Sequence, residues 1–505
     1  MGTAGLVIGA LLGILLVGLG GISFPVIDKI IHDEVIKSVI LYKNSTVGYK
    51  NWADLPGGMY IEFCFFHLNN SAEVLAGGKP VLIEKGPYSY RYFKPKLNIS
   101  YDHEDGTVMY SNFPTYIFDP ETSNGDPSDI ITTLNVPLMS IAEQLKYENP
   151  LYQEIVLTLL ARIEKEDIFL EITINDLLWG YLDNMLKLVH DFDKTLVPDP
   201  HFGFMYNRNH TPGSTYEVYS GEKDAMLIAN VKSFNGMDQL QWWTTPEANA
   251  INGSDGTYNH PFWSEHREEY LFSSDACRSV IMKFERHTRI KGIPTMKFSI
   301  PSFALQSGKT YPPNAGFCIP DSDHCLPDGL LNISQCQGGA PAIMSLPHFL
   351  FVDDDVRAKV DGLYPDAEKH NAFINVEPYT GASLEGALRM QFNIWMEKFV
   401  DASQMKNLPT LPFPVMWVNQ HGTVNSDSAD TIKAKLITPI FITNIAKWCL
   451  IGLGGAILII VLSVAVFRKL KRKAPTKSVN GVTTSINSNG QTTEVPSDET
   501  RPLLS

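Results

Sequence analysis

ALRMQFNIWM, residues 387–396, is the stretch that most directly indicates the fold. Apolar side chains recur there at every second position, which is typical of a strand with one face on a core. SYRYF (89–93), after an expected turn at EKGP (84–87), and MKFERHTRI (282–290) alternate in the same way. No internal repeat or low-complexity linker interrupts residues 28–440, so we expect one large, mainly antiparallel β domain. In the strand predicted over residues 387–396, the inward face would carry Leu388, Met390, Phe392, Ile394 and Met396.

Both ends of the chain carry long apolar runs. Each run has no charged residue and is about as long as the 20 residues needed to cross hydrocarbon. The first lacks a basic n-region and a small-residue cleavage site, so we expect an uncleaved anchor. RKLKRK (468–473) follows the second run and marks the cytosolic side. The sequence thus predicts a cytosolic N-terminus (1–4), a transmembrane helix (5–27), a lumenal domain (28–447), a second transmembrane helix (448–467) and a cytosolic tail (468–505).

Potential N-glycosylation sites support this topology. Six N-x-S/T sequons lie between the two apolar runs, and the tail has none. This distribution fits a glycosylated lumenal domain. The six asparagines are Asn44, Asn69, Asn98, Asn209, Asn252 and Asn332.

The net charge of −14 is unevenly distributed. Residues 468–505 hold seven of the 41 Lys and Arg and three of the 55 Asp and Glu, so the rest of the chain has a charge of −18. Such a body repels nucleic acid, and no nucleic-acid-binding motif accompanies it. All thirteen histidines lie between the apolar runs, so acid would make this part less negative.

Helical patterns interrupt the strands between residues 138 and 190. TINDLLWGYLDNMLKLVH (173–190) has Thr173 and Asp176 at capping-box spacing and predicts one helix. LYQEIVLTLLARIEKE (151–166) has more apolar surface than one neighbouring helix would cover. Core packing and a partner-binding surface are the two alternatives for this segment. The residues concerned are Leu151, Tyr152, Ile155, Val156, Leu159 and Leu160.

Four cysteines cluster in the second half of the body. In an oxidising compartment they can pair in three ways, which spacing alone does not resolve. A metal site is the alternative, because CIPDSDHC (318–325) places Asp321, Asp323 and His324 between two cysteines. Its spacing matches no standard zinc pattern, so we expect disulfides and no metal. The four are Cys277, Cys318, Cys325 and Cys336.

Signatures of catalysis are missing from the sequence. It contains no G-x-S-x-G, H-E-x-x-H or G-x-x-x-x-G-K-[ST] motif, and no G-x-G-x-x-G at a strand-to-helix turn. We therefore expect no catalytic residue, no cofactor and no enzymatic activity. An unrecognised lumenal hydrolase with a pair of carboxylates is the alternative from another class of protein.

Seven longer motifs carry a resemblance to a known family. In order along the body they are EKGPYSYR, NGMDQLQWW, INGSDG, NAGFCIP, LNISQCQGGAPAIMSLPHF, EPYTG and FPVMW. This series, between two terminal spans, resembles the class B scavenger receptors. The resemblance implies a large antiparallel β-barrel-like lumenal domain with an apical helical bundle. It also implies an internal tunnel for lipids such as cholesterol and phospholipids.

The same resemblance assigns roles to residues of this chain. It pairs Cys318 with Cys325 and Cys277 with Cys336, and places the helices around residues 138–190 at the apex. In lysosomal members of the family, the apex binds β-glucocerebrosidase and releases it in acid with the help of a histidine. This chain has no histidine in residues 104–189. Other members are cell-surface receptors for lipoproteins or modified lipids, which is the alternative function.

The end of the tail reads SDETRPLLS, residues 497–505. Glu499 precedes Leu503 by four residues, and with Leu504 they form an acidic dileucine signal of the kind that clathrin adaptors bind. The rest of the tail is polar and we expect it to be disordered. The signal predicts sorting to lysosomal and late endosomal membranes.

Small residues occur at helical spacing in both apolar runs. Gly9 and Gly13 form G-x-x-x-G in the first, and Gly452 and Ala456 form a similar pair in the second. Such pairs allow close contact between transmembrane helices. The contact would form within one chain or between two copies in a homo-oligomer; the alternative is that the spacing arises by chance, since glycine is common in both runs.

Overall fold

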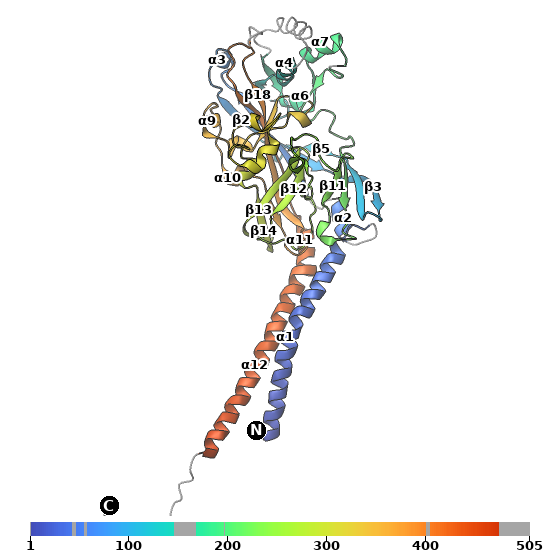
Figure 1. Cartoon of the computed structure of the whole chain (residues 1–505), viewed down its shortest axis with the longest axis vertical. Helices are drawn as coiled ribbons and strands as arrows, with labels where there is room; N and C mark the ends of the chain where they lie inside the picture. Colours follow the sequence, from blue (N-terminus) through green and yellow to red (C-terminus); the bar gives the residue numbers. More distant parts are fainter. Residues whose placement is uncertain are drawn as a thin grey trace, which may run out of the picture. The chain divides into compact units, whose positions relative to one another are not determined.

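The computed structural model describes residues 2–42, 47–54, 58–145, 168–195, 197–399 and 405–473. The chain divides into two compact units. One unit comprises the chain up to residue 27 and from residue 442 onward, and its described part is helical. The other comprises residues 28–441 and contains the sheets (Figure 1).

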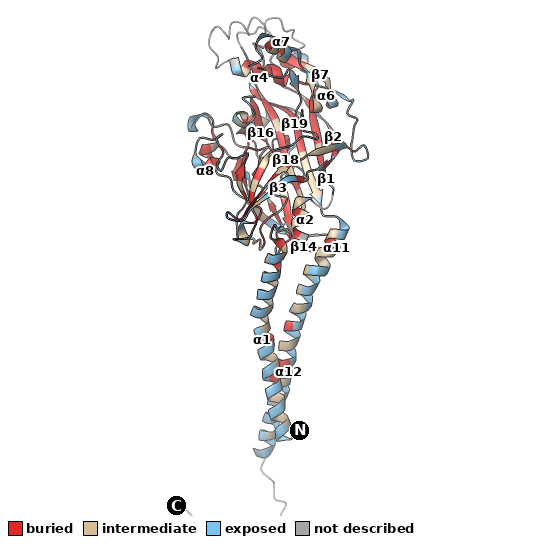
Figure 2. Ribbon diagram, turned by 90° about the vertical axis from the view of Figure 1, so that its right-hand side faces the viewer, coloured by how far each residue is buried: buried red, intermediate tan, exposed pale blue. Residues whose placement is uncertain are grey.

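Two long helices make up the first unit and run on into the second. α1 (Thr3–Val39) and α12 (Thr438–Lys473) are long and apolar enough to cross a membrane. Most of their side chains are exposed or half-buried (Figure 2), as is expected of side chains that face lipid. Both helices extend beyond the predicted spans, because α1 continues past residue 27 and α12 begins before residue 448.

Glycines bring these two helices into contact. A Cβ added to Gly13 would lie 2.7 Å from Cγ of Leu458, and one added to Gly454 would lie 2.8 Å from the carbonyl oxygen of Gly13. Only residues without a side chain allow such close approach. Gly13 thus packs against the other helix of the same chain, which is one of the alternatives that the sequence left open. On α12 the contact is made by Gly454, whereas Gly452 faces open space.

The main sheet of the second unit is antiparallel, as predicted. Its described strands run in the order β12-β13-β14-β17-β18-β19-β1-β2-β5, with β16 beside β18 and β15 beside β16. β12 and β5 do not pair, so the described strands form an open sheet and not the closed barrel that the resemblance implied. The bounds are β1 (Met59–Leu68), β2 (Leu82–Phe93), β5 (Thr115–Phe118), β12 (Glu269–Ser273), β13 (Arg278–Ile290), β14 (Ile293–Ser299), β15 (Leu331–Asn332), β16 (Ala342–Ser345), β17 (Phe373–Val376), β18 (Ser383–Met396) and β19 (Leu411–Thr423).

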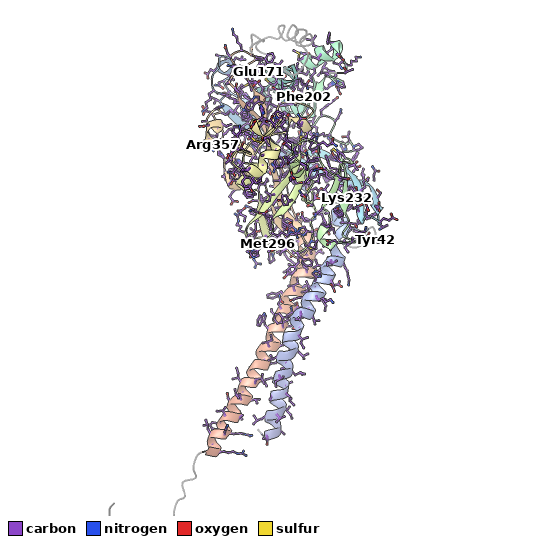
Figure 3. All side chains as sticks on the ribbon, viewed as in Figure 1. Tyr42, Glu171, Phe202, Lys232, Met296 and Arg357 are labelled. Carbon is purple, nitrogen blue, oxygen red and sulfur yellow. A yellow bond between two sulfur atoms is a disulfide. The ribbon has the colours of Figure 1, made fainter. Side chains whose placement is uncertain are left out.

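Smaller sheets accompany the main one. The largest has the order β11-β10-β4-β3, and its edge residue Lys232 (Figure 3) bonds the carboxylates of Glu217 and Asp105 at 3.0 and 2.7 Å. β6 pairs with β7, and β8 with β9. The bounds are β3 (Lys96–Asp102), β4 (Thr107–Asn112), β6 (Ile130–Leu134), β7 (Phe169–Thr173), β8 (Tyr181–Leu182), β9 (His201–Phe202), β10 (Thr215–Tyr219) and β11 (Val231–Phe234).

β18 contains the alternating stretch, but its second face is not solvated as simple alternation suggests. Gln391 and Asn393 are fully buried there. The Gln391 amide donates to the Asn393 side chain at 2.7 Å, and Asn393 donates to the carbonyl of Ile343 and to Ser345 Oγ on β16. β16 covers this part of the strand and supplies partners for the buried polar groups.

Two predicted boundaries were wrong. The EKGP segment lies inside β2 and not in a turn before it, because β2 pairs with β1 on both sides of a register shift. The helix predicted over 173–190 is two helices, α6 and α7, separated at Gly180, whose φ of 121° a helix does not allow. Thr173 does cap α6, because its side chain accepts a hydrogen bond from the backbone N–H of Asp176.

The described helices of the second unit are short. They include α4, α6 and α7 from the predicted apical region, where β7 and β8 also occur, so the bundle stays a prediction. The bounds are α2 (Val47–Ala53), α3 (Ser71–Leu75), α4 (Val136–Leu145), α6 (Ile174–Trp179), α7 (Asn184–Phe192), α8 (Pro246–Asn249), α9 (Asp354–Arg357), α10 (Ala367–His370), α11 (Ser426–Ile432), the π-helical η8 (Lys433–Ile437), and the 3-10 turns η2 (Ala225–Leu227), η3 (Ser302–Leu305), η4 (Pro312–Phe317), η5 (Ser322–His324), η6 (Ser334–Cys336) and η7 (Pro347–Phe349).

Two large apolar cores lie on different parts of the main sheet. The first joins β12, β13 and β17 to the sheet of β4, β10 and β11. The second joins β1, β16 and β19 to α4, and it contains the buried thiol of Cys64. Burial raises the pKa of this thiol well above its usual range, so it is an inert core residue.

Candidate functional site

An apolar cavity of 260 Å³ lies against the main sheet of the second unit. Strands β1, β12, β13, β16, β17, β18 and β19 line it, together with α11. The predominance of aliphatic side chains suits a hydrocarbon ligand, since ligand pockets bind mainly through such contacts. Its lining includes Leu271, Val280, Met282, Met344, Ile374 and Met390.

Two small residues on β18 leave room for the cavity. Ala387 and Gly386 on β18 lie opposite Phe373 and Ile374 on β17, and all four line the space. Ala387 is buried, so a larger side chain there would occupy volume that is now empty. The cavity therefore depends on small side chains within a run of otherwise large apolar ones.

Arg389 and Glu385, two of the charged groups that line the cavity, are engaged by protein atoms. The Arg389 guanidinium donates to the carbonyls of Glu368 and Asn371 and to the Asn419 side chain. Glu385 accepts from the Asn375 amide at 2.8 Å. Burial alone would raise the pKa of Asp255, but the ammonium groups of Lys96 and Lys94 outweigh it and lower that pKa. Asp255 Oδ1 accepts from the backbone N–H and the hydroxyl of Thr257, whereas its buried Oδ2 has no hydrogen-bond partner among the described residues.

A polar loop closes one side of the cavity. Ser254 Oγ donates to Asn259 Oδ1 at 2.6 Å, and the Asn259 amide donates to the carbonyl of Gly381 and to Ser383 Oγ. Residues 255–258 of this loop line the cavity. The INGSDG motif is thus tied to the start of β18 through Asn259, and the sequence contained no signal for that connection.

The cysteines form two disulfides. Cys277 is bonded to Cys336 and Cys318 to Cys325, which are the pairs that the family resemblance implies. The metal alternative for CIPDSDHC fails because both of its thiols are in a disulfide, and His324 Nδ1 lies 2.7 Å from the Asp321 carboxylate. Within the described ranges, no group of three or more His, Cys, Asp or Glu side chains is arranged to hold a metal ion.

Five of the six sequon asparagines lie in the described residues. Asn69, Asn98 and Asn252 are exposed. Asn209 is half-buried and exchanges hydrogen bonds with the main chain of Tyr116, and Asn332 is also half-buried. Asn44 lies outside the described residues, and glycosylation at all six stays a prediction.

Two predicted sites lie wholly outside the described residues. They are the apolar segment with Leu151, Tyr152, Ile155, Val156, Leu159 and Leu160, and the tail signal with Glu499, Leu503 and Leu504. Sequence reasoning, for its part, missed the individual residues of the cavity. They come from strands far apart in the chain, so no local motif marks them.

Comparisons with known proteins agree with the resemblance noted in the sequence. Lysosome membrane protein 2 of Rattus norvegicus is 36% identical over 423 residues, covering 84% of this chain and 86% of the relative. Lysosome membrane protein 2 of Homo sapiens is 34% identical with the same coverage. Scavenger receptor class B member 1 of Sus scrofa is 29% identical over 449 residues, or 89% of this chain and 87% of that protein.

A family model described as the CD36 family matches residues 9–465, which include most of both long helices and all described sheets. Two relatives above 30% identity cover more than two thirds of the chain. On these grounds the chain belongs to the CD36 family.

Proposed function

We propose that this protein is a two-pass membrane receptor of the lysosome that binds a lipid in its apolar cavity and performs no covalent chemistry. The observation that carries the proposal is the cavity itself, which is lined by aliphatic side chains from six strands. Relatives named as a lysosome membrane protein and a scavenger receptor support the receptor class. Residues 5–27 and 448–467 are the proposed membrane spans.

The ligand is a neutral or zwitterionic lipid, such as cholesterol or a phospholipid. The Arg389 guanidinium, which lines the cavity, donates to three protein oxygens, so it is not free to bind a carboxylate headgroup. The cavity is part of the internal tunnel through which the lipid moves. Apolar contacts provide most of the binding free energy in such a site.

Filling the cavity tests this proposal. Ala387→Phe should reduce cross-linking of a photoreactive cholesterol analogue to the purified full chain, because the ring takes the ligand's space. Ala358→Phe adds the same ring at an exposed position after α9 and should bind as the unmodified chain does. Equal cross-linking of the two folded variants would show that the lipid does not enter this cavity.

We propose that both termini are cytosolic. The subcellular location of the protein then depends on the sorting signal in its C-terminal tail. Leu503→Ala with Leu504→Ala should remove clathrin-adaptor binding and move the protein from lysosomes and late endosomes to the cell surface. Imaging of tagged protein against a lysosomal marker measures this. Surface residence of the unmodified chain would instead support a cell-surface scavenger receptor.

A protein ligand is proposed for the segment that contains Tyr152, Val156 and Leu160. By the family resemblance the partner is β-glucocerebrosidase, bound through a few apolar anchors. Charge substitutions at these three positions should abolish binding without affecting glycoprotein maturation. Normal binding by matured variants would leave lipid transport as the function. The absence of histidine from residues 104–189 means that acid release would need other titrating groups.

A further inference from the structure

A buried arginine lies beside a second, much smaller cavity. Arg278 begins β13, directly after Cys277, and is only 6% exposed. Its guanidinium stacks on Phe317 with the guanidinium carbon 3.4 Å from the ring centroid. Its Nε donates to the carbonyl of Ser279 at 3.3 Å. The cavity has a volume of 20 Å³ and also touches the loop closed by the disulfide between Cys318 and Cys325.

The charge of Arg278 has no counter-charge in this cavity. No aspartate or glutamate is among the residues that line it, and its other titratable lining residue is His324. In the described part of the chain, the two terminal NH2 groups of Arg278 have no hydrogen-bond acceptor. Burial lowers the pKa of Arg278 to about 9, so the group still carries its charge at neutral and acidic pH.

Arg389 shows how the same fold treats a partly buried arginine elsewhere. Its NH1 group donates to the carbonyls of Glu368 and Asn371, and its Nε donates to Asn419. Those carbonyl dipoles replace the water that the guanidinium loses on burial. Arg278 has one such contact, through Nε, and its remaining donors are left at the small cavity.

We propose that this cavity binds one small monovalent anion, such as chloride, as the counter-ion of Arg278. A buried charge without a partner is costly, and an anion beside the guanidinium removes that cost. The volume accommodates about one water-sized particle, which excludes phosphate and organic carboxylates. Gln306 and His324 line the same cavity and supply further N–H donors.

The position of the cavity predicts that the anion stabilises the fold. The anion would lie between the start of β13, the turn η4 that carries Phe317 and the loop of residues 318–325. Because the unfolded chain has no such cavity, the anion binds the folded state alone and raises its stability with concentration.

Halide dependence of unfolding tests the proposal. The purified full chain in detergent should unfold at a higher temperature in sodium chloride or bromide than in sodium gluconate of equal ionic strength. Arg278→Met should abolish the difference. Arg389→Met, which removes an arginine already satisfied by protein carbonyls, should lower the midpoint and keep the halide dependence. An unmodified chain that responds equally to all three salts, or an Arg278→Met chain that keeps the halide response, would overturn the proposal.

Anomalous scattering gives a second measurement that needs no variant. Crystals of the full chain grown in bromide should show an anomalous peak within hydrogen-bonding distance of the Arg278 guanidinium. Water in the cavity with no anomalous signal would refute the anion, whatever the folding of Arg278→Met.

Discussion

His348 and His370 lie together beside β2 and β19, whereas His260 lies near β12, the strand at one edge of the main sheet. All three side chains are buried. They differ in what faces their ring nitrogens. A neutral imidazole has one donor and one acceptor, and a charged imidazolium has two donors, so the neighbours of a buried ring decide its charge.

The first region requires neutral rings. The backbone N–H of Tyr364 donates to His348 Nδ1 at 3.1 Å, and that of Asp366 donates to His370 Nδ1 at 2.9 Å. His348 therefore carries its proton on Nε2, which lies 2.5 Å from the Glu84 carboxylate. The two rings stack with centroids 4.4 Å apart, so charging both would bring two cations together. Burial and the neighbouring His348 lower the pKa of His370 to about 4.

In the second region both ring nitrogens of His260 face oxygen atoms. His260 Nε2 lies 2.8 Å from the Glu269 carboxylate, and Nδ1 lies 2.8 Å from the carbonyl oxygen of Pro261. A protonated ring would satisfy this arrangement by donating from both nitrogens, with the Glu269 carboxylate as its counter-ion. Trp263 stacks on the same ring with centroids 5.7 Å apart.

The difference teaches that one sheet can contain histidines that respond to acid in opposite ways. Protonation at the first region breaks a backbone hydrogen bond, whereas the second region is complete only when its ring is protonated. For a receptor proposed to reside in an acidic compartment, acid would loosen the environment of His370 and leave that of His260 intact.

Replacing the Glu269 carboxylate beside His260 should have the largest effect on the free energy of unfolding. Glu269→Leu removes the buried carboxylate that lies 2.8 Å from His260 and 3.4 Å from Arg267, and the loss of such a buried partner costs about 3–5 kcal/mol of unfolding free energy. Unfolding of the purified full chain at pH 6 measures it. Glu268→Leu is the matched control, because Glu268 pairs with Lys283 at an exposed site and should cost about 1 kcal/mol or less. Equal losses in the two variants would contradict a buried ion pair.

Sequence alone predicts the strand β18 well, but it does not predict that polar side chains on β18 are buried. The alternation in residues 387–396 indicates β18 because side-chain direction in a strand is a local property. The burial of Gln391 and Asn393 is not local, since their partners Ile343 and Ser345 lie on β16. Simple alternation therefore assigned this face to solvent.

The same limit applies to the histidines and to the cavity. His348 and Glu84 are 264 positions apart in the chain, and no pattern near either residue reveals their contact. The thirteen histidines predict that the protein responds to acid. They do not predict whether acid stabilises or destabilises the surroundings of any one histidine. The expectation of a lipid tunnel came from family resemblance, because the residues that line the cavity meet only when seven strands assemble.

Acid should weaken the first region. An unfolded histidine has a pKa of about 6.5, so as pH falls the unfolded chain binds the proton before folded His370 does. The stability contributed by neutral His370 is complete above about pH 6.5 and is lost as pH falls toward 4, on the order of 1–3 kcal/mol in total. Asp366 and Glu84 favour the charged ring, and Arg389 and His348 oppose it.

His370→Phe isolates this contribution. The variant keeps a ring beside His348 but cannot accept from Asp366 N–H, so it should be less stable than the unmodified chain at pH 7. Because phenylalanine does not titrate, the deficit should narrow at pH 5. Unfolding midpoints at both pH values measure it, with the exposed His266→Gln as a control that should leave the pH response unchanged. A deficit of equal size at both pH values would show that His370 is not held neutral.

The smallest effect on the free energy of unfolding is expected from an isosteric change of Glu84, because its partner His348 is an uncharged ring. Glu84→Gln keeps an oxygen to accept from His348 Nε2 and from Trp417 Nε1, which lies 3.1 Å away. Burial alone would raise the pKa of Glu84, but these two hydrogen bonds outweigh it and lower that pKa, so the carboxylate is ionised at neutral pH. Its loss turns two charge-assisted hydrogen bonds into neutral ones, at a cost of about 1 kcal/mol.

The same substitution at the second region, Glu269→Gln, should cost clearly more, because a charged ring would then face an uncharged amide. Unfolding of both variants at pH 6 makes the comparison with identical chemistry at each site. If Glu84→Gln proved as destabilising as Glu269→Gln, His348 would have to be charged as well, and the contrast between the two histidine regions would fail.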